Sequence, residues 1–144
     1  MTELSTDAAI ADLGERVLDT SLPKSEWTHE AHFALALWCL RHRPALTAPE
    51  AMRGVITRLN EAHGTPNTDT EGYHHTITLA SLRAARAVHD SGTADLELSR
   101  VLARLIDGVF GRSDWIFAYW TPELLFSVNA RSRWVEPDIR PLPF

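Results

Sequence analysis

Two short polar segments of the chain have the residue types and the spacing needed for metal or acid–base chemistry. Each has the order Glu-x-x-His with a further histidine close by: Glu26 to His29 with His32, and Glu71 to His74 with His75. On a helix, a Glu-x-x-His step places a carboxylate and an imidazole on one face about one turn apart. Carboxylate-bridged metal centres in helical bundles use this arrangement. The two segments, which hold four of the seven histidines, are therefore the candidate site.

A transition metal is the cofactor that these side chains favour. His29 and His32 are three residues apart and can bind one ion from adjacent turns, and Glu71 precedes His74 and His75 by three and four residues. Imidazole and carboxylate ligands suit iron, manganese, zinc or copper, whereas calcium and magnesium require more oxygen ligands. We expect a divalent transition metal held by the four histidines, with Glu71 as a ligand or a base.

The number and the position of the carboxylates determine whether such a centre holds one ion or two. A dinuclear centre needs two Glu-x-x-His helices and one glutamate from each of two further helices, all facing inward. Here both motifs lie where helices are expected to begin, and Glu15 and Glu61 are the nearest additional carboxylates. A mononuclear site is therefore favoured. A structural explanation competes with metal binding, because a glutamate stabilises the first turn of a helix and histidines there bond loop carbonyls.

Without a metal, the same side chains suit general acid–base catalysis of the kind that isomerases, cyclases and lyases perform. A histidine transfers protons near neutral pH, and Glu71 or Glu30 would orient it. Tyr73 would serve as a proton donor and Arg131 as the anchor of a substrate. Nucleophilic hydrolysis is disfavoured, because Cys39 lies in an apolar stretch and no Gly-x-Ser-x-Gly elbow occurs.

Aromatic residues are concentrated in the C-terminal third of the chain. Six of them fall within twenty residues and are interleaved with arginines: Trp115, Phe117, Tyr119, Trp120, Phe126 and Trp134. Such rings either wall a ligand cavity, with an arginine as anchor, or form part of the core, as in most small domains. A non-catalytic module that binds a small ligand or another protein is therefore the alternative to an enzyme.

Charge and composition limit the partners that we expect. The chain has 144 residues, a formal net charge of −5 and a single lysine, Lys24, so no polybasic tract suggests nucleic acid or an anionic membrane. We expect a small-molecule substrate, and the sequence leaves the oligomeric state open. The single cysteine excludes an intrachain disulfide, and neither a secretory leader nor a span of about 18 apolar residues occurs. These features predict a cytoplasmic protein.

Apolar periodicity predicts a single all-α domain over residues 1–144, a compact bundle of five to six helices with an extended C-terminal tail. The expected helices cover about 6–19, 25–43, 47–63, 68–89 and 93–107, with a short one from 121 and a tail over 134–144. The second helix is apolar nearly all round, which predicts central burial. Capping-box patterns at Thr47 with Glu50 and at Thr68 with Glu71 mark the expected starts of the third and fourth helices.

The short connections between the first four helices predict antiparallel neighbours. The second and fourth helices then run in the same direction, with their N-termini at one end of the bundle. This arrangement brings His29 and His32 towards His74 and His75, and the end of the third helix, with Asn60 and His63, lies there too. If His29 and His74 share an ion, their ring nitrogens are about 3 to 6 Å apart.

The sequence resembles a family of small uncharacterised bacterial helical proteins. The resemblance lies in Trp27-Thr28-His29 with His32, in the stretch from Asn67 to Thr76 with Gly72-Tyr73-His74, and in Leu125-Phe126-Ser127, Ala130-Arg131 and Val135-Glu136-Pro137-Asp138. It covers most of the chain and implies that these segments form one unit, without implying an activity. In that pattern the position of His75 is often glutamate, which makes His74 the preferred ligand of the pair.

Overall fold

The computed structural model describes residues 4–92 and 95–144, and the regular structure in these ranges is helical throughout. The α-helices are α1 Asp7–Leu18, α2 His29–His42, α3 Pro49–Ala62, α4 His75–Asp90, α5 Leu98–Asp107, α6 Pro122–Leu125 and α7 Val128–Ser132. Short 3-10 helices lie between them: η1 Lys24–Glu26, η2 Pro44–Thr47, η3 Val109–Gly111 and η4 Trp115–Ala118. The all-α prediction is confirmed.

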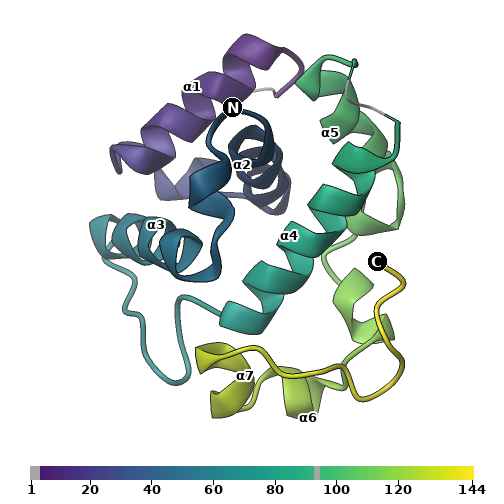
Figure 1. Cartoon of the computed structure of the whole chain (residues 1–144). Helices are drawn as coiled ribbons and strands as arrows, with labels where there is room; N and C mark the ends of the chain where they lie inside the picture. The colour runs from purple at the N-terminus through teal and green to yellow at the C-terminus, as the bar shows by residue number, and fades with distance from the viewer. Residues whose placement is uncertain (1–3, 93–94) are drawn as a thin grey trace.

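Helix α2 lies at the centre of the bundle, as its apolar composition predicts (Figure 1). Its buried side chains occur on every face and comprise Ala31 and all residues from Phe33 to Cys39. Helices α1, α4 and α5 pack around it. Burial of one large aliphatic or aromatic side chain contributes roughly 1.5–3 kcal/mol. The packing therefore fixes the position of α2, including the polar residues at its start.

Helix α2 begins later than the sequence predicts. The expected start near Ser25 is wrong, because Lys24–Glu26 form the separate turn η1 and α2 begins at His29. Thr28 is the N-cap, and its hydroxyl oxygen accepts a hydrogen bond from the backbone N–H of Ala31 at 3.2 Å. Glu26 thus lies outside the helix, where it pairs with Arg16 at 3.4 Å. The expected helical Glu-x-x-His face is absent from this segment.

Helix α4 also begins later, at His75, so the predicted capping box of Thr68 and Glu71 is wrong. The preceding residues form a loop held by Asn67, whose side-chain oxygen accepts from the backbone N–H of Tyr73 at 3.0 Å. Gly72 in this loop has φ +79°, and a Cβ there would lie 2.3 Å from the carbonyl oxygen of Pro66. The loop therefore requires glycine, and Glu71 lies before the helix instead of in its first turn.

Other predicted boundaries are confirmed or corrected by their capping bonds. Thr121 caps α6 as expected, and Thr6, near which the first helix is expected to begin, is the N-cap of α1. Gly64 follows α3 with the left-handed φ of +74°. The capping box of Thr47 and Glu50 is wrong: Thr47 belongs to η2, and its hydroxyl donates to the carbonyl of Pro44 at 2.7 Å. The expected start of the fifth helix at Thr93 lies outside the described residues, and α5 begins at Leu98.

The starts of helices α2 and α4 lie near each other, as the connection lengths predict, but the two helices are not parallel. His32 near the start of α2 lines a hollow together with Ile77 and Thr78 near the start of α4. At the opposite ends, the guanidinium of Arg41 lies 3.4 Å from the imidazole Nε2 of His89. Figure 1 shows α2 nearly end-on and α4 diagonally across the view, so the two helices cross obliquely. Residues near the starts of both helices therefore border one hollow.

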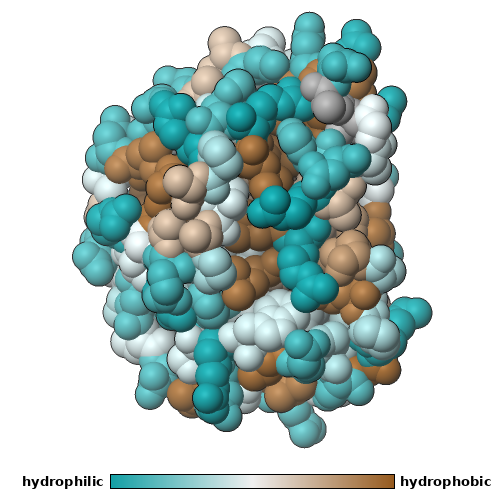
Figure 2. Space-filling model, viewed as in Figure 1, coloured by the Kyte–Doolittle hydropathy of each residue, from teal (hydrophilic) through white to brown (hydrophobic). Residues whose placement is uncertain are grey.

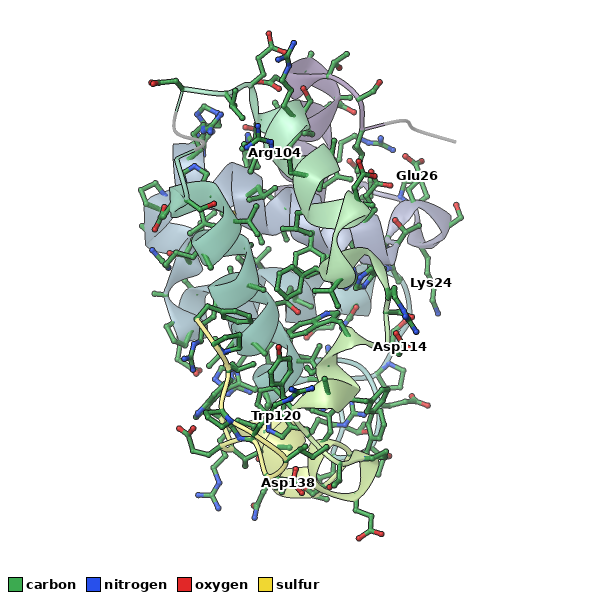
Figure 3. The ribbon with its side chains drawn as sticks, turned by 90° about the vertical axis from the view of Figure 1, so that its right-hand side faces the viewer. Lys24, Glu26, Arg104, Asp114, Trp120 and Asp138 are labelled. Carbon is green, nitrogen blue, oxygen red and sulfur yellow. The ribbon has the colours of Figure 1, made fainter. Side chains whose placement is uncertain are left out.

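The C-terminal segment packs against the body of the protein, so an extended tail is not clearly present. Trp120 is completely buried, and its indole N–H donates to the carbonyl of Val135 at 3.1 Å. The carboxylate of Asp138 accepts from the backbone N–H of Thr121 at 2.8 Å and from its hydroxyl at 2.7 Å. Figure 3 shows Trp120 and Asp138 together at one end of the molecule. Over the described ranges, no helix has both the length and the apolar character needed to cross a bilayer.

Candidate functional site

A hollow of about 350 Å³ opens between the start of α2, the end of α3 and the start of α4. We call it the polar hollow. Its lining includes side chains from all three elements and from η1: Lys24, Trp27, His32, Asn60, His63 and His74. Lys24 is the only residue of the lining with a full charge at neutral pH, and the lining contains no aspartate or glutamate. The predicted meeting of the end of α3 with the starts of α2 and α4 thus occurs here.

His32 has the geometry of a functional histidine. Its Nδ1 lies 2.7 Å from the backbone carbonyl oxygen of Thr28, which accepts a hydrogen bond only from a protonated Nδ1. This bond assigns the neutral tautomer with a lone pair on Nε2. Among the residues that the structure describes, Nε2 has no hydrogen-bond partner. The ring also stacks on Trp27, with centroids 3.7 Å apart and planes at 28°, so that two contacts fix its orientation.

The protein surroundings keep the His32 ring neutral. His32 is exposed by surface area, but its ring lies among many protein atoms, and this desolvation lowers the pKa of His32 to about 4. Its backbone hydrogen bond opposes this shift, and the neighbouring His29 adds to it. At neutral pH the Nε2 lone pair is therefore available to accept a proton or a hydrogen bond, or to bind a metal.

His63 and Asn60 at the end of α3 provide further polar atoms. His63 Nε2 donates to the carbonyl of Leu22 at 2.7 Å, which leaves the lone pair of Nδ1 without a partner in the part of the chain that the structure describes. The side-chain amide nitrogen of Asn60 donates to Asn67 at 3.0 Å, and its carbonyl oxygen remains available. Polar groups on α3 thus face the same hollow as the His32 ring.

Two further spaces adjoin the polar hollow at His32. The first, which we call the apolar slot, has a volume of about 60 Å³ and includes Leu35, Met52 and Leu82 in its lining. The second, which we call the aromatic hollow, has a volume of about 360 Å³ and is lined by rings that include Phe33, Trp115, Phe117 and Phe126. His32 and Ile77 line all three spaces. The His32 ring therefore stands where a polar and an aromatic region meet.

His74 is the N-cap of α4, and both of its nitrogens are in use. Nδ1 accepts from the backbone N–H of Ile77 at 3.2 Å, and Nε2 donates to the carbonyl oxygen of Leu125 at 2.6 Å. Burial, as the largest cause, holds the pKa of His74 below its ordinary value. Although His74 borders the polar hollow, neither nitrogen has a lone pair left for a ligand, and its observed bonds are those of a structural residue.

His29 lies in the first turn of α2 and contacts a different part of the chain. Its Nε2 donates to the carbonyl oxygen of Phe110 at 2.7 Å, and its ring packs edge-to-face on Phe33. It lines the aromatic hollow but not the polar one. His29 and His74 thus bond separate backbone carbonyls and border separate spaces, and His32 lies between these spaces.

Tyr73, which belongs to the lining of the polar hollow, bonds to His75, which does not line it. The Tyr73 hydroxyl lies 2.6 Å from Nδ1 of His75, and His75 Nε2 lies 3.9 Å from a carboxylate oxygen of Glu50. Burial raises the pKa of Tyr73 to about 12 and lowers that of His75. The Tyr73 hydroxyl, which the sequence suggests as a proton donor, is therefore engaged with His75.

The remaining predicted residues, Glu71 and Arg131, lie on the loop before α4 and on α7. Glu71 is exposed and does not line the polar hollow. Arg131 donates to the backbone carbonyls of Gly72 at 3.1 Å and Tyr73 at 3.4 Å. Arg131 thus holds the loop against α7. Its buried Nε has no hydrogen-bond partner among the residues described.

A metal centre made of the predicted residues is not assembled in the described part of the chain. Within residues 4–92 and 95–144, no three His, Cys, Asp or Glu side chains are grouped so that they could hold a metal ion. Metal binding by His29, His32, His74 and His75 therefore stays a prediction. Sequence reasoning placed His32, His63 and Asn60 at one end of the bundle, but it missed Lys24 and Trp27 as site residues.

A larger hollow along α5 lacks the chemistry of the polar hollow. It has a volume of about 540 Å³, lies along α5, and contains no histidine; its charged residues are Glu30, Glu97, Arg100 and Asp107.

Comparison of the chain with known protein families, curated proteins and solved structures found no match. The chemistry of the polar hollow is therefore the basis for a functional assignment.

Proposed function

We propose that the chain is an enzyme that transfers a proton on a small organic molecule, with His32 as the proton acceptor. One observation supports this proposal above all others: His32 lines a ligand-sized hollow, its Nδ1 is bonded to the Thr28 carbonyl, and its Nε2 has no partner among the residues that the structure describes. A positioned base with an available lone pair is the requirement for general base catalysis. Isomerisation is the reaction type that needs only such a transfer.

The proton transfer that we propose is balanced within the substrate and one imidazole. Nε2 of His32 takes a proton from a C–H or O–H group, and the bonding electron pair stays on the substrate as an enolate or alkoxide. The imidazolium keeps its Nδ1–H bond to Thr28 and returns the Nε2 proton to another substrate atom. An imidazole with a pKa of about 4 is a weak base, but a negative charge on a bound substrate raises this pKa by favouring the imidazolium.

A metal-assisted reaction is the second candidate, and it rests on the two open imidazole nitrogens of the polar hollow. His32 Nε2 and His63 Nδ1 both lack a partner in the described ranges, and each ring's other nitrogen donates to a backbone carbonyl. Metal-ligating histidines have this second bond. Two imidazoles leave most of a coordination sphere to water or substrate, and the lining has no carboxylate. We therefore rank metal-assisted oxidation or hydrolysis below proton transfer.

A comparison of wild type with His32→Gln tests the proposal without knowledge of the substrate. Each protein is incubated with a small-molecule extract of bacterial cells, and the extract is then profiled by mass spectrometry and proton NMR. His42→Gln is the matched control, because His42 is exposed at the far end of the same helix. We expect at least one compound to change with wild type and His42→Gln but not with His32→Gln.

Two results would count against the proposal. If wild type changes no compound, the chain is not an enzyme for small molecules of the extract, and a binding module is favoured. If His32→Gln changes the same compounds at the wild-type rate, another residue carries the reaction. Repeating the incubation after dialysis against a chelator separates the two enzyme candidates, because only the metal-assisted reaction is lost.

A further inference from the structure

We infer that the molecule bound at His32 is a small aromatic carboxylate, with its carboxylate in the polar hollow near Lys24 and its ring in the aromatic hollow. This inference rests on the proposed function, because it names the substrate class of the same site. It adds two sets of residues that the proton transfer itself does not require: the cation of Lys24, and the rings of Phe117 and Phe126.

The charge of the polar hollow favours an anion. Lys24 supplies the only full charge in the lining, and both the polar and the aromatic hollow lack aspartate and glutamate. The chain as a whole is acidic, with a formal net charge of −5. The linings of these two adjoining hollows therefore differ from the rest of the chain, because they contain no carboxylate side chain. Figure 3 shows Lys24 at the outer edge of the molecule, where its ammonium can meet an incoming anion. A ligand carboxylate would pair with Lys24 and accept hydrogen bonds at the mouth of the hollow.

The aromatic hollow favours a flat apolar group. Phe33, Trp115, Phe117 and Phe126 contribute to its walls, and apart from the His29 and His32 imidazoles it contains no ionisable side chain. Phe126 is 53% exposed although its ring packs against Phe117 at 5.9 Å between centroids. Figure 2 shows hydrophobic residues at the surface where α6 and α7 lie. A bound ring would cover Phe126 and make the edge-to-face or offset contacts that aromatic groups prefer.

The position of His32 connects the two ends of such a ligand. His32 and Ile77 border both hollows, so a ligand with its carboxylate near Lys24 and its ring near Phe126 would have the atoms between these two groups beside the His32 ring. A carbonyl group of the ligand next to these carbon atoms would make their C–H bonds more acidic. The two hollows have the size range of small-molecule sites. The substrate class is thus an aryl-substituted short-chain acid.

Calorimetric titration of the full chain with defined probes tests this inference. The probes are benzoate, phenylacetate, 3-phenylpropionate and indole-3-acetate, each compared with its own neutral amide, and butyrate as the acid without a ring. We expect at least one aromatic acid to bind at least about tenfold more tightly than its amide and than butyrate. Lys24→Gln should remove the preference for the acid over its amide. Phe126→Ala should weaken the binding of the aromatic acid by about fivefold or more.

Matched variants control for unspecific effects. Arg104→Gln removes a positive charge from an exposed residue of α5 that Figure 3 shows away from Lys24, and Val128→Ala shortens an exposed apolar side chain that borders neither hollow. Both should bind like wild type. The inference is overturned if no aromatic acid binds at about 5 mM, if the amides bind as well as the acids, or if Lys24→Gln and Arg104→Gln behave alike.

The binding result and the turnover result can fail separately. Selective binding of aromatic acids, combined with an extract that neither wild type nor His32→Gln changes, would refute the proposed enzyme and keep the ligand class. Turnover that depends on His32, combined with no selectivity for aromatic acids, would keep the enzyme and refute the ligand class.

Discussion

Replacement of His74 by alanine should destabilise the protein strongly, because His74 makes two bonds that alanine cannot make. Loss of the bond from Nδ1 to the Ile77 N–H removes the N-cap of α4, which costs about 1 kcal/mol. Loss of the bond from Nε2 leaves the carbonyl oxygen of Leu125, a completely buried residue, without its partner, which costs about 1–3 kcal/mol. The sum is a loss of about 2–4 kcal/mol in the free energy of unfolding.

Two further variants separate the two bonds. Asparagine is a good N-cap but is too short to replace the imidazole Nε2, so His74→Asn should restore about 1 kcal/mol relative to His74→Ala. His42→Ala, at the exposed end of α2, should stay within about 0.5 kcal/mol of wild type.

Urea unfolding followed by circular dichroism gives the free energies, and thermal unfolding should show a decrease of roughly 4–16 °C for His74→Ala. The structural role of His74 is refuted if His74→Ala unfolds within about 0.5 kcal/mol of wild type. It is also refuted if His74→Asn is no more stable than His74→Ala, because the capping bond would then contribute nothing.

Three further predictions follow from the same contacts. Because His32, His74 and His75 have pKa values below the ordinary 6.5, the unfolded chain binds more protons than the folded chain below about pH 7. The free energy of unfolding should therefore fall as the pH drops from about 7 to 4, and a flat profile from urea titrations in this range would contradict the pKa directions. Gly72→Ala should destabilise by more than Gly64→Ala, since both have positive φ but only Gly72 lies against the Pro66 carbonyl; equal urea midpoints would refute this contact. Removal of bound metals by a chelator should leave activity towards the substrate unchanged, and a loss that zinc, iron, manganese or copper restores would establish the metal-assisted candidate instead.

Local sequence signals predict the parts of the fold that local contacts determine. Thr6 and Thr121 cap the helices that follow them, and the apolar run of α2 produces a buried central helix. Local signals mispredict the start of α4, because contacts with residues far along the chain hold the preceding segment in a loop conformation. Arg131 binds the carbonyls of Gly72 and Tyr73 from more than fifty positions away, and no pattern around Thr68 reveals this contact.

The candidate site shows the same division between local and distant contacts. Residue spacing and connection lengths bring His32 and His63 to one end of the bundle, and the structure places both at the polar hollow. Which ring nitrogen of a histidine keeps an unpaired lone pair depends on which of its two nitrogens bonds a backbone carbonyl. The Thr28 carbonyl is local to His32, but the carbonyls of Leu22 and Leu125, which bind His63 and His74, come from distant segments. The sequence therefore identifies a histidine-rich end but not which histidine remains available.

The protonation state of His32 is the most direct test of the account, because the proposed chemistry depends on an open Nε2. Long-range ¹H–¹⁵N NMR of the full chain, with His32→Gln used to assign the resonances, reports the tautomer and the pKa of each histidine. We expect the His32 ring at neutral pH to carry its proton on Nδ1, to have an unprotonated Nε2, and to titrate with a pKa of about 4. A His32 ring that carries its proton on Nε2 at neutral pH would have no Nε2 lone pair to accept a proton, and this result would contradict the central claim.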